Sequence, residues 1–380
     1  MPRYAAPQPS APRSAPHALH KSLLPRSPRE SRVAQPLSVG PPPISAPVPV
    51  QSVPATGPVE TGRDTPVRRR IADTDLLVHP LALGGSVFGW TIDGSAAMRV
   101  LDRHRDLGGN FVDTADSYAA GRSEVIIGSW LRSRGARDDT VIATKIGRNR
   151  DHPGLSAASI TGAVQASLER LGTDHIDLLY FHLDDPDVPL EESLGAVDAL
   201  IRRGQVRYLA ASNFTAERLM EARVLSANGL PRFVALETHY NLVHREPFES
   251  SLALPTHAQG MAVLPYFALA HGFLAGRYRT RADATGTARA GRAAAYLNRN
   301  GLRVLGVVDR IAVDHGVPPA TIALAWLLAR DGTFVPVAGA SLPEQVDALV
   351  AAAGIRLGRG EMVELDRVSV APGPATGPRR

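Results

Sequence analysis

The chain has 380 residues, 44% of them hydrophobic and 21% charged, so it is long enough to bury the core of one large domain or two ordinary ones. It contains no cysteine, which excludes disulfides, thiolate metal sites and cysteine nucleophiles. No apolar run reaches the roughly 18 residues of a membrane span, and we expect a cytoplasmic protein without a membrane partner.

Residues 1–66 differ in composition from the rest of the chain. They hold 16 of the 31 prolines, and we predict a disordered, Pro/Arg-rich N-terminal extension that is partly polyproline II. An organelle transit peptide and a natural start near Val67 are alternative interpretations. Residues 1–70 carry 10 Lys+Arg and 3 Asp+Glu, a net +7, which leaves 5 − 7 = −2 for the remainder. The folded part therefore has no basic excess that would indicate a nucleic-acid partner.

From residue 67 to residue 370, short apolar runs alternate with amphipathic stretches of helical periodicity. We predict a short hairpin in "RRRIADTDLLVHP", before the first strand. Several helical stretches end at a glycine, the usual C-cap residue: Gly135, Gly172 and Gly204. The apolar runs are rich in β-branched residues, which is typical of strands covered on both faces. In chain order the strand candidates are "HPLALGG", "NFVDTAD", "TVIATKIG", "IDLLYFHLDD", "VRYLAASNF", "FVALETHYNL", "MAVLPYFAL" and "TFVPVAGAS".

Eight strand–helix units over roughly 285 residues predict an α/β fold of the (β/α)8 TIM-barrel type. The rival fold is a doubly wound sheet, but no GxGxxG follows the first strand, which weakens its dinucleotide-binding version. Residues 277–320 exceed the simple repeat, and we expect a long loop followed by one or two helices there. Residues 371–380 are predicted to be a flexible C-terminal tail.

Polar residues collect where the predicted strands end, which is where a (β/α)8 barrel has its active site. Strand two ends at Asp113, its loop carries Tyr118, and strand three ends at Lys145. Each residue alone has an ordinary explanation, such as a helix cap or a surface side chain. Their convergence at one end of one barrel favours a functional site. The further candidates, at the ends of strands four to seven, are His182, Ser212, Asn213, Glu237 and Tyr266.

Lys145 is unusual because the chain otherwise uses arginine for positive charge. Of the 42 Lys+Arg, only Lys21 and Lys145 are lysines, and Lys21 lies in the predicted extension. Lysine is a compact charge whose pKa responds to its surroundings, whereas arginine stays protonated and spreads its charge over a planar fork. We infer that position 145 requires an ammonium group.

The residue types Asp, Tyr, Lys and His fit a site that protonates a carbonyl group. A tyrosine with an ordinary pKa near 10 is a reluctant proton donor at neutral pH, and a nearby ammonium lowers that pKa. A carboxylate holds the ammonium in place, and a neutral histidine orients the carbonyl oxygen. We therefore predict that Asp113, Tyr118, Lys145 and His182 are the catalytic residues of a carbonyl reduction by hydride transfer.

Several segments resemble, in the same order, those of the aldo-keto reductase family, in particular its bacterial members. "GGNFVDTADSYAAGRSEVIIGSWL" resembles the segment around the family's catalytic Asp and Tyr, "VIATKIG" its Lys strand and "IDLLYFHLDDPDVPLEESL" its His strand. "VRYLAASNF", "YNLVHRE", "LPYFALAHGFLAGRY" and "VPVAGASLPEQV" resemble its cofactor-binding segments. The resemblance covers residues 67–370 and implies a (β/α)8 reductase of small-molecule aldehydes or ketones. It implies NADPH (NADP+) as the cofactor, with NADH as the alternative.

The same resemblance assigns roles to individual residues. Tyr118 would be the proton donor, Lys145 and Asp113 its tuning pair, and His182 the group that orients the substrate. The other residues that it implies are Ser212 and Asn213 on the nicotinamide carboxamide, Tyr266 stacked on the ring, Phe273 and Leu274 near the pyrophosphate, Gly339, Ser341 and Gln345 along the 2′-phosphate, and Phe88 and Trp90 walling the substrate pocket.

Three features depart from the family pattern. Glu237 stands where Gln is usual, and its charge should favour the cationic oxidised ring, so we predict that Glu237→Gln weakens binding of the oxidised relative to the reduced cofactor. Leu349 stands where an Asn commonly contacts adenine, so that contact is missing. Gly339 and Gln345 provide no basic side chain, so the preference for NADP(H) rests on the family's habit and on Ser341 and Gln345.

Two other functions are compatible with the same residues. One is a nicotinamide-binding regulatory subunit without turnover, and the other is an alcohol dehydrogenase of specialised metabolism that works in the reverse direction. We interpret Asp184, Asp185 and Asp187 as a solvated or helix-capping loop and predict no metal site, because no matching ligand set accompanies them.

Overall fold

A short antiparallel hairpin begins the part of the chain that the computed structural model describes, residues 68–285 and 288–370. Strands β1 (Arg69–Arg70) and β2 (Leu77–Val78) pair as the sequence predicts. Ile71, Leu76 and Val78 are buried in one cluster with inward-facing residues of the larger sheet, so the hairpin covers one end of its interior. The predicted extension, residues 1–66, and the predicted tail, residues 371–380, lie outside the described residues.

Within the described residues, eight parallel strands form one sheet that curls into a barrel. They are β3 (Ala82–Gly84), β4 (Phe111–Asp113), β5 (Val141–Ile146), β6 (Ile176–Phe181), β7 (Val206–Ser212), β8 (Phe233–His239), β9 (Ala262–Tyr266) and β10 (Val337–Ala338). Each pairs with the next along the chain up to β9, and β10 pairs with β3. The circle closes where the N–H of Val263 donates to O of Thr333, at 2.8 Å, and the N–H of Val335 donates to O of Val263, at 2.9 Å. The predicted (β/α)8 TIM barrel is confirmed.

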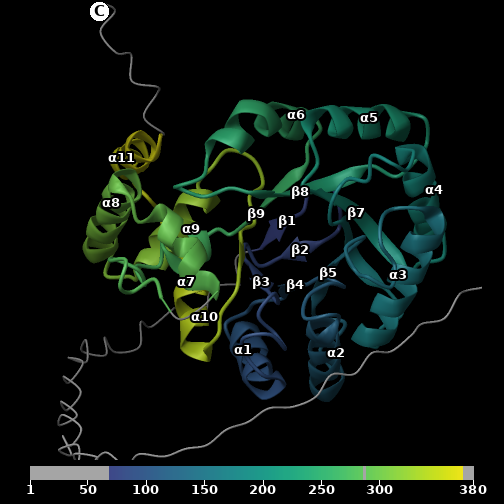
Figure 1. Ribbon diagram of the computed structural model, residues 1–380, viewed down its shortest axis with the longest axis horizontal. Helices are drawn as coiled ribbons and strands as arrows, with labels where there is room; N and C mark the ends of the chain where they lie inside the picture. The colour runs from purple at the N-terminus through teal and green to yellow at the C-terminus, as the bar shows by residue number, and fades with distance from the viewer. Residues whose placement is uncertain (1–67, 286–287, 371–380) are drawn as a thin grey trace, which may run out of the picture. The chain divides into compact units, whose positions relative to one another are not determined.

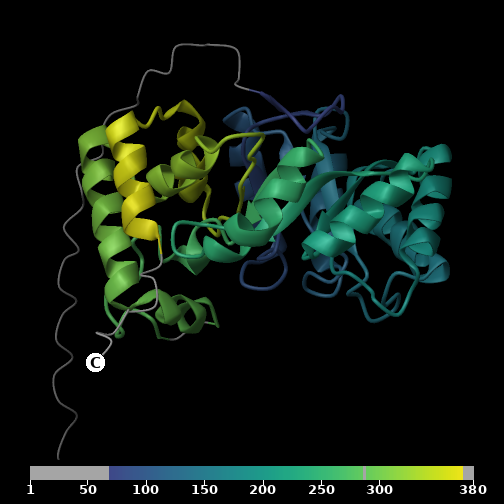
Figure 2. The ribbon, with the colours of Figure 1, turned by 90° about the horizontal axis from the view of Figure 1, so that it is seen from above.

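Eleven α-helices accompany this sheet in the described part of the chain. They are α1 (Gly94–Asp106), α2 (Arg122–Arg134), α3 (Ala157–Leu171), α4 (Leu190–Arg202), α5 (Ala216–Ala227), α6 (Ala253–Ala258), α7 (Ala288–Ala293), α8 (Arg299–His315), α9 (Pro319–Leu328), α10 (Pro343–Val350) and α11 (Arg359–Ser369). Residues 277–320 contain a loop, all of α7 and α8 and the first residues of α9. The sequence predicts only one or two helices there, because α7 is too short to produce a helical period. Figures 1 and 2 show α8 and α11 side by side next to the barrel.

Among the described residues, no single helix is long and apolar enough to cross a membrane. In the part of the chain that the structure describes, only α8 and α9 together reach that length and composition, and the pair is bent by 97°.

The glycines predicted to end helices adopt a left-handed backbone. Gly135 and Gly172 are the C-caps of α2 and α3, with φ of 56° and 64°. In α4 the C-cap is Arg203, and Gly204 follows it with φ of 73°. A side chain with a Cβ atom is disfavoured in this conformation, so these glycines determine where the chain turns back toward the next strand.

Side chains alternate along each strand between the barrel interior and the surrounding helices. In β5, Ala143 belongs to the interior cluster, whereas Ile142 and Ile146 pack with the helices. Because this alternation has a period of two residues, Lys145 faces the interior with Ala143. The same rule places two acidic residues inside the barrel, each two positions after an interior residue. These inward pairs are Phe111 with Asp113 and Ala235 with Glu237.

Candidate active site

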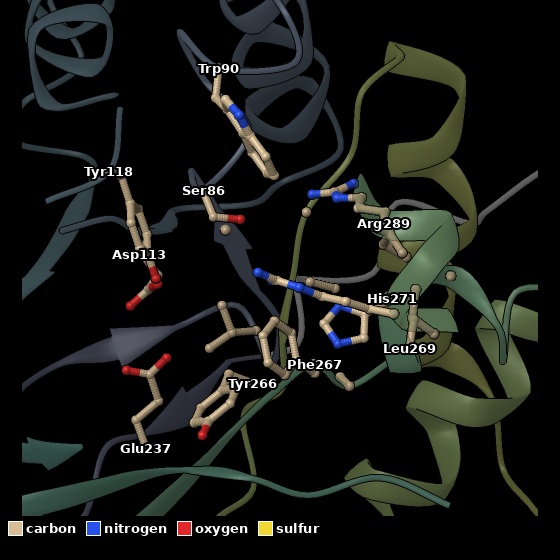
Figure 3. A pocket seen from close by; sticks show the side chains of 18 of the residues that line it. Ser86, Trp90, Asp113, Tyr118, Glu237, Tyr266, Phe267, Leu269, His271 and Arg289 are labelled. Atoms are coloured by element: carbon tan, nitrogen blue, oxygen red, sulfur yellow. The ribbon is translucent and has the colours of Figure 1, made fainter. Parts of the chain in front are cut away.

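A cavity of about 840 Å³ opens where the parallel strands end, as expected for a barrel of this type. Figure 3 shows Tyr118 and Asp113 on one side of this cavity and His271 and Arg289 on the other. The last residues of five strands contribute to its wall: Gly84, Asp113, Ser212, Tyr266 and Ala338.

Lys145 lies at the centre of a buried charge cluster and is 1% exposed. Its Nζ donates to Asp113 Oδ1 at 2.5 Å and to the carbonyl oxygen of Thr114 at 3.1 Å. Nζ also lies 3.3 Å from Glu237 Oε2, without a hydrogen bond between the two atoms. Burial by itself would lower the pKa of Lys145, but Asp113, and Glu237 where it is ionised, raise it above the ordinary value, so the ammonium stays charged.

Tyr118 lies between this ammonium and a histidine. Lys145 Nζ is 5.4 Å from the centre of the Tyr118 ring, and the rings of Tyr118 and His182 meet edge to face with centroids 6.0 Å apart. Burial raises the pKa of Tyr118 above its ordinary value of 10, and the charge of Lys145 acts against that rise. The ammonium therefore acts to lower the pKa of Tyr118, as predicted, but burial raises that pKa by more.

The loop that carries Tyr118 is strained. Three successive residues after it, Ala119, Ala120 and Gly121, have positive φ of 51°, 56° and 85°. A left-handed backbone costs an alanine roughly 1 kcal/mol, and such strain persists mainly where a side chain must be aimed at a functional site. The strained turn lies beside the cavity, which both Tyr118 and Ala119 line.

His182 is held in the neutral form. Burial, and then the charges of Lys145 and Arg148, lower its pKa to about 3. Its buried Nδ1 has no hydrogen-bond partner among residues 68–285 and 288–370. A neutral imidazole with a free ring nitrogen is suited to hydrogen-bond with a ligand in the cavity.

The sequence suggests that Glu237 is an ionised carboxylate, but its surroundings favour the protonated form. Burial raises its pKa to about 8, an effect that Asp113 increases and Lys145 opposes. At neutral pH the side chain is therefore mostly a protonated carboxyl group, which can donate a hydrogen bond. The predicted preference for the oxidised ring should thus appear only above about pH 8.

The residues predicted for the nicotinamide end are linked to one another. Asn213, with a left-handed φ of 57°, donates from Nδ2 to O of His182 and to Oγ of Ser212, both at 3.0 Å. The hydroxyl of Tyr266 donates to Asn213 Oδ1 at 2.7 Å. These bonds fix the Tyr266 ring at the cavity wall.

Of the residues predicted along the phosphates, Gly339 and Gln345 line the cavity, as does Leu349. The Ser341 side chain is not part of the cavity wall, and its N–H donates to Gln345 Oε1 at 2.9 Å. Phe273 and Leu274 bury their side chains completely in the hydrophobic core. Their segment reaches the cavity through two small neighbours instead, Gly272 and Ala275.

The two residues predicted to wall the substrate pocket lie in different surroundings. Trp90 lines the cavity and is 52% exposed. The structure corrects the assignment of Phe88, which is fully buried in the hydrophobic core and does not line the cavity. The direction of a side chain in the loop after β3 depends on how the loop packs, which the residue types do not reveal.

Four arginines that sequence reasoning did not select line the cavity: Arg148, Arg277, Arg289 and Arg292. Arg277 directly follows the "GFLAG" segment. Its position next to a predicted cofactor-binding segment could have identified it from the sequence. Arg289 and Arg292 belong to α7, which has no recognisable period. Arg289, which lies across the cavity from Tyr118 in Figure 3, gives that side of the cavity a positive character.

The fold and this site together define a class of protein. A (β/α)8 barrel that gathers a buried lysine–carboxylate pair, a tyrosine and a neutral histidine at its strand ends is an oxidoreductase that acts on a carbonyl group. The particular family follows from comparison with known proteins.

The chain belongs to the aldo/keto reductase family, whose model matches residues 80–370. It is 34% identical to aldo-keto reductase AMT2 of Alternaria alternata over 336 residues, which cover 78% of this chain and 90% of that protein. It is 34% identical to norsolorinic acid reductase B of Aspergillus parasiticus over 286 residues, or 69% of this chain and 73% of that protein. It is 30% identical to aryl-alcohol dehydrogenase GME11368 of Pestalotiopsis microspora over 307 residues, or 76% and 78% of the two chains.

Proposed function

We propose that this protein reduces an aldehyde or ketone with NADPH and that Tyr118 is the proton donor. The observation that carries the proposal is the buried ammonium of Lys145, which is bonded to Asp113 and lies 5.4 Å from the centre of the Tyr118 ring. Membership of the aldo/keto reductase family supports the reaction class.

The chemistry follows from the charge states of these residues. Tyr118 gives its phenolic proton to the carbonyl oxygen while the carbonyl carbon accepts a hydride. Lys145 stabilises the phenolate that remains, and Asp113 holds the ammonium in place. His182 is neutral, because burial lowers its pKa to about 3, and its hydrogen bond orients the carbonyl oxygen.

The cavity fits a nicotinamide dinucleotide, which supplies the hydride when it is bound. Three buried atoms at the reacting end lack a hydrogen-bond partner among the described residues: Asp113 Oδ2, His182 Nδ1 and Glu237 Oε2. Buried polar atoms without partners are costly, and ligand groups at this end would satisfy them. In this proposal Ser212, Asn213 and the protonated Glu237 hold the carboxamide, and Tyr266 lies against the ring.

Arg277 and Arg289 support NADPH over NADH. Burial, and then the charge of Arg277, lower the pKa of Arg289, so these like charges repel each other in the absence of an anion. Guanidinium groups match phosphate oxygens well, and the 2′-phosphate of NADPH provides the additional negative charge. These arginines take the place of the basic side chains that Gly339 and Gln345 do not provide.

The experiment that tests this function is a panel of aldehydes and ketones with NADPH and with NADH, followed at the nicotinamide absorbance. We expect turnover with NADPH that is lost in Tyr118→Phe, while that variant still binds the cofactor. Cofactor binding without turnover on any carbonyl would instead support a regulatory subunit. Faster oxidation of alcohols with NADP+ would support the dehydrogenase direction, for which one relative is named.

A further inference from the structure

Arg148 lines the cavity but has no role in the proposed reaction. It follows β5 by two residues, on the loop that leads to α3. Across the described residues, no hydrogen bond or ion pair holds its guanidinium. Its charge nevertheless acts at the reacting end. After burial and Lys145 it lowers the pKa of His182, and at Tyr266 it opposes the rise that burial and Glu237 cause.

The loop of Arg148 is fixed even though its guanidinium is not. The N–H of Gly154 donates to O of Gly147 at 3.0 Å and closes the loop at its base. Asn149 Nδ2 donates to O of Asp116 at 2.8 Å, and the N–H of Leu155 donates to Asp185 Oδ2, also at 2.8 Å. The backbone therefore presents Arg148 in a defined position, which reduces the ordering cost of a contact with a ligand.

No carboxylate of the cavity wall neutralises Arg148. Asp113 and Glu237 face Lys145 in the barrel interior, and the other acidic residue of the wall, Glu344, belongs to α10. The arginines suited to the cofactor phosphates come from a different segment, and Figure 3 shows one of them, Arg289, across the cavity from Tyr118. Arg148 is thus a free cation on the side where the carbonyl reacts.

Large apolar side chains are exposed in the same cavity. Trp90, Leu183 and Phe267 line it, with exposures of 52%, 41% and 41%. Leu183 directly follows His182, and Phe267 directly follows Tyr266, so both adjoin the reacting end. Exposed apolar groups that gather in a cavity mark a surface that a ligand covers.

We propose that the substrate is a carbonyl compound with an apolar aromatic body and a carboxylate, and that Arg148 binds the carboxylate. This inference rests on the proposed function, because the reduction supplies the reacting group. A guanidinium donates two parallel hydrogen bonds to a carboxylate, which selects for charge and for orientation. The aromatic body covers Trp90, Leu183 and Phe267.

The test compares 2-, 3- and 4-formylbenzoate with their neutral methyl esters, each with NADPH and the full chain. Arg148→Gln removes the cation, Arg148→Lys keeps a charge without the planar fork, and Arg150→Gln is the matched control, because Arg150 is exposed on the same loop but does not line the cavity. We expect at least one acid to exceed its ester in kcat/KM by about tenfold or more, as a charge-assisted hydrogen bond allows.

Arg148→Gln should abolish this preference mainly through KM, Arg148→Lys should retain part of it, and Arg150→Gln should behave as the natural protein. The preference should also decrease as salt is added, because screening weakens the ion pair. Equal kcat/KM for acids and esters in the natural protein, or an unaltered preference in Arg148→Gln, would overturn the role of Arg148 and leave the reductase intact. Failure to reduce any of the six compounds or simple aldehydes would overturn the proposed function itself.

Discussion

The ammonium of Lys145 lies 3.3 Å from Oε2 of Glu237, so this lysine faces a second acidic side chain besides Asp113. Glu237 occupies the position where the resemblance to the family leads us to expect a glutamine. Burial raises its pKa to about 8, which makes it a neutral hydrogen-bonding group at pH 7 and a carboxylate at higher pH. Its charge state therefore couples Lys145 to the predicted nicotinamide site.

Glu237→Gln should remove a pH dependence of cofactor preference. In the natural protein the ratio of the Kd of NADP+ to that of NADPH should fall by about fivefold between about pH 7 and pH 9, because the new carboxylate attracts the cationic ring by roughly 1 kcal/mol. In Glu237→Gln the ratio should stay constant over this range. Fluorescence titration of both cofactors at several pH values measures it, and a parallel pH dependence in the two proteins would refute this role.

Lys145→Arg should keep the positive charge and lose most of the turnover. The lysine is 1% exposed, and the rings of Tyr118 and Tyr180 lie 5.4 Å and 5.3 Å from its Nζ, so a larger planar group has to displace its neighbours. We expect kcat to fall by about a hundredfold or more, and overpacking to cost about 1–3 kcal/mol of stability. Steady-state kinetics and thermal melting provide the two measurements, and a near-normal kcat would show that the geometry of the cation is unimportant.

Arg289→Gln and Arg277→Gln should each raise the KM of NADPH by about tenfold, because each removes a charge-assisted hydrogen bond to phosphate. The KM of NADH should change less, since NADH lacks the 2′-phosphate. Arg281→Gln is the control, because Arg281 is exposed in the same segment and does not line the cavity. Equal losses for NADPH and NADH would assign these arginines to the pyrophosphate instead.

His79 and His104 should make the fold sensitive to acid. Their ring centroids are 6.2 Å apart, and burial, with the charge of Arg68, lowers the pKa of His79 to about 4 and that of His104 to about 3. In the unfolded chain a histidine takes up its proton near pH 6.5. The stability that the neutral rings contribute is therefore complete above about pH 6.5 and is lost as the pH falls toward 4, by roughly 2 kcal/mol per histidine between pH 6.5 and pH 5.

His104→Leu should reduce this loss, because Nε2 of His104 is buried without a hydrogen-bond partner among the described residues and an apolar side chain needs none. Urea unfolding at about pH 7 and pH 5 gives the free energy of unfolding for each protein. The exposed His257→Leu serves as the control. If His104→Leu loses as much stability on acidification as the natural protein, the buried pair is not the source.

Much of the candidate site could be predicted from the sequence because its residues stand at the ends of strands. Once alternation of apolar runs and helical stretches indicates a (β/α)8 barrel, residues such as Asp113, Lys145 and His182 must lie at one end of it. Their roles remain predictions that the proposed experiments test. Arg148 and Arg289 were not predicted, because loops and the six-residue helix α7 have no periodic pattern that indicates where they point.

The sequence by itself determined the barrel and the order of its strands, since hydrophobic period and glycine caps are local properties of the chain. It also determined the family, because several motifs occur in the same order. Only the tertiary structure decided that Phe88 is buried while Trp90 lines the cavity, because loop packing sets the direction of both side chains. It also decided that the pKa of Glu237 is raised, because desolvation depends on how much of the folded protein surrounds a group.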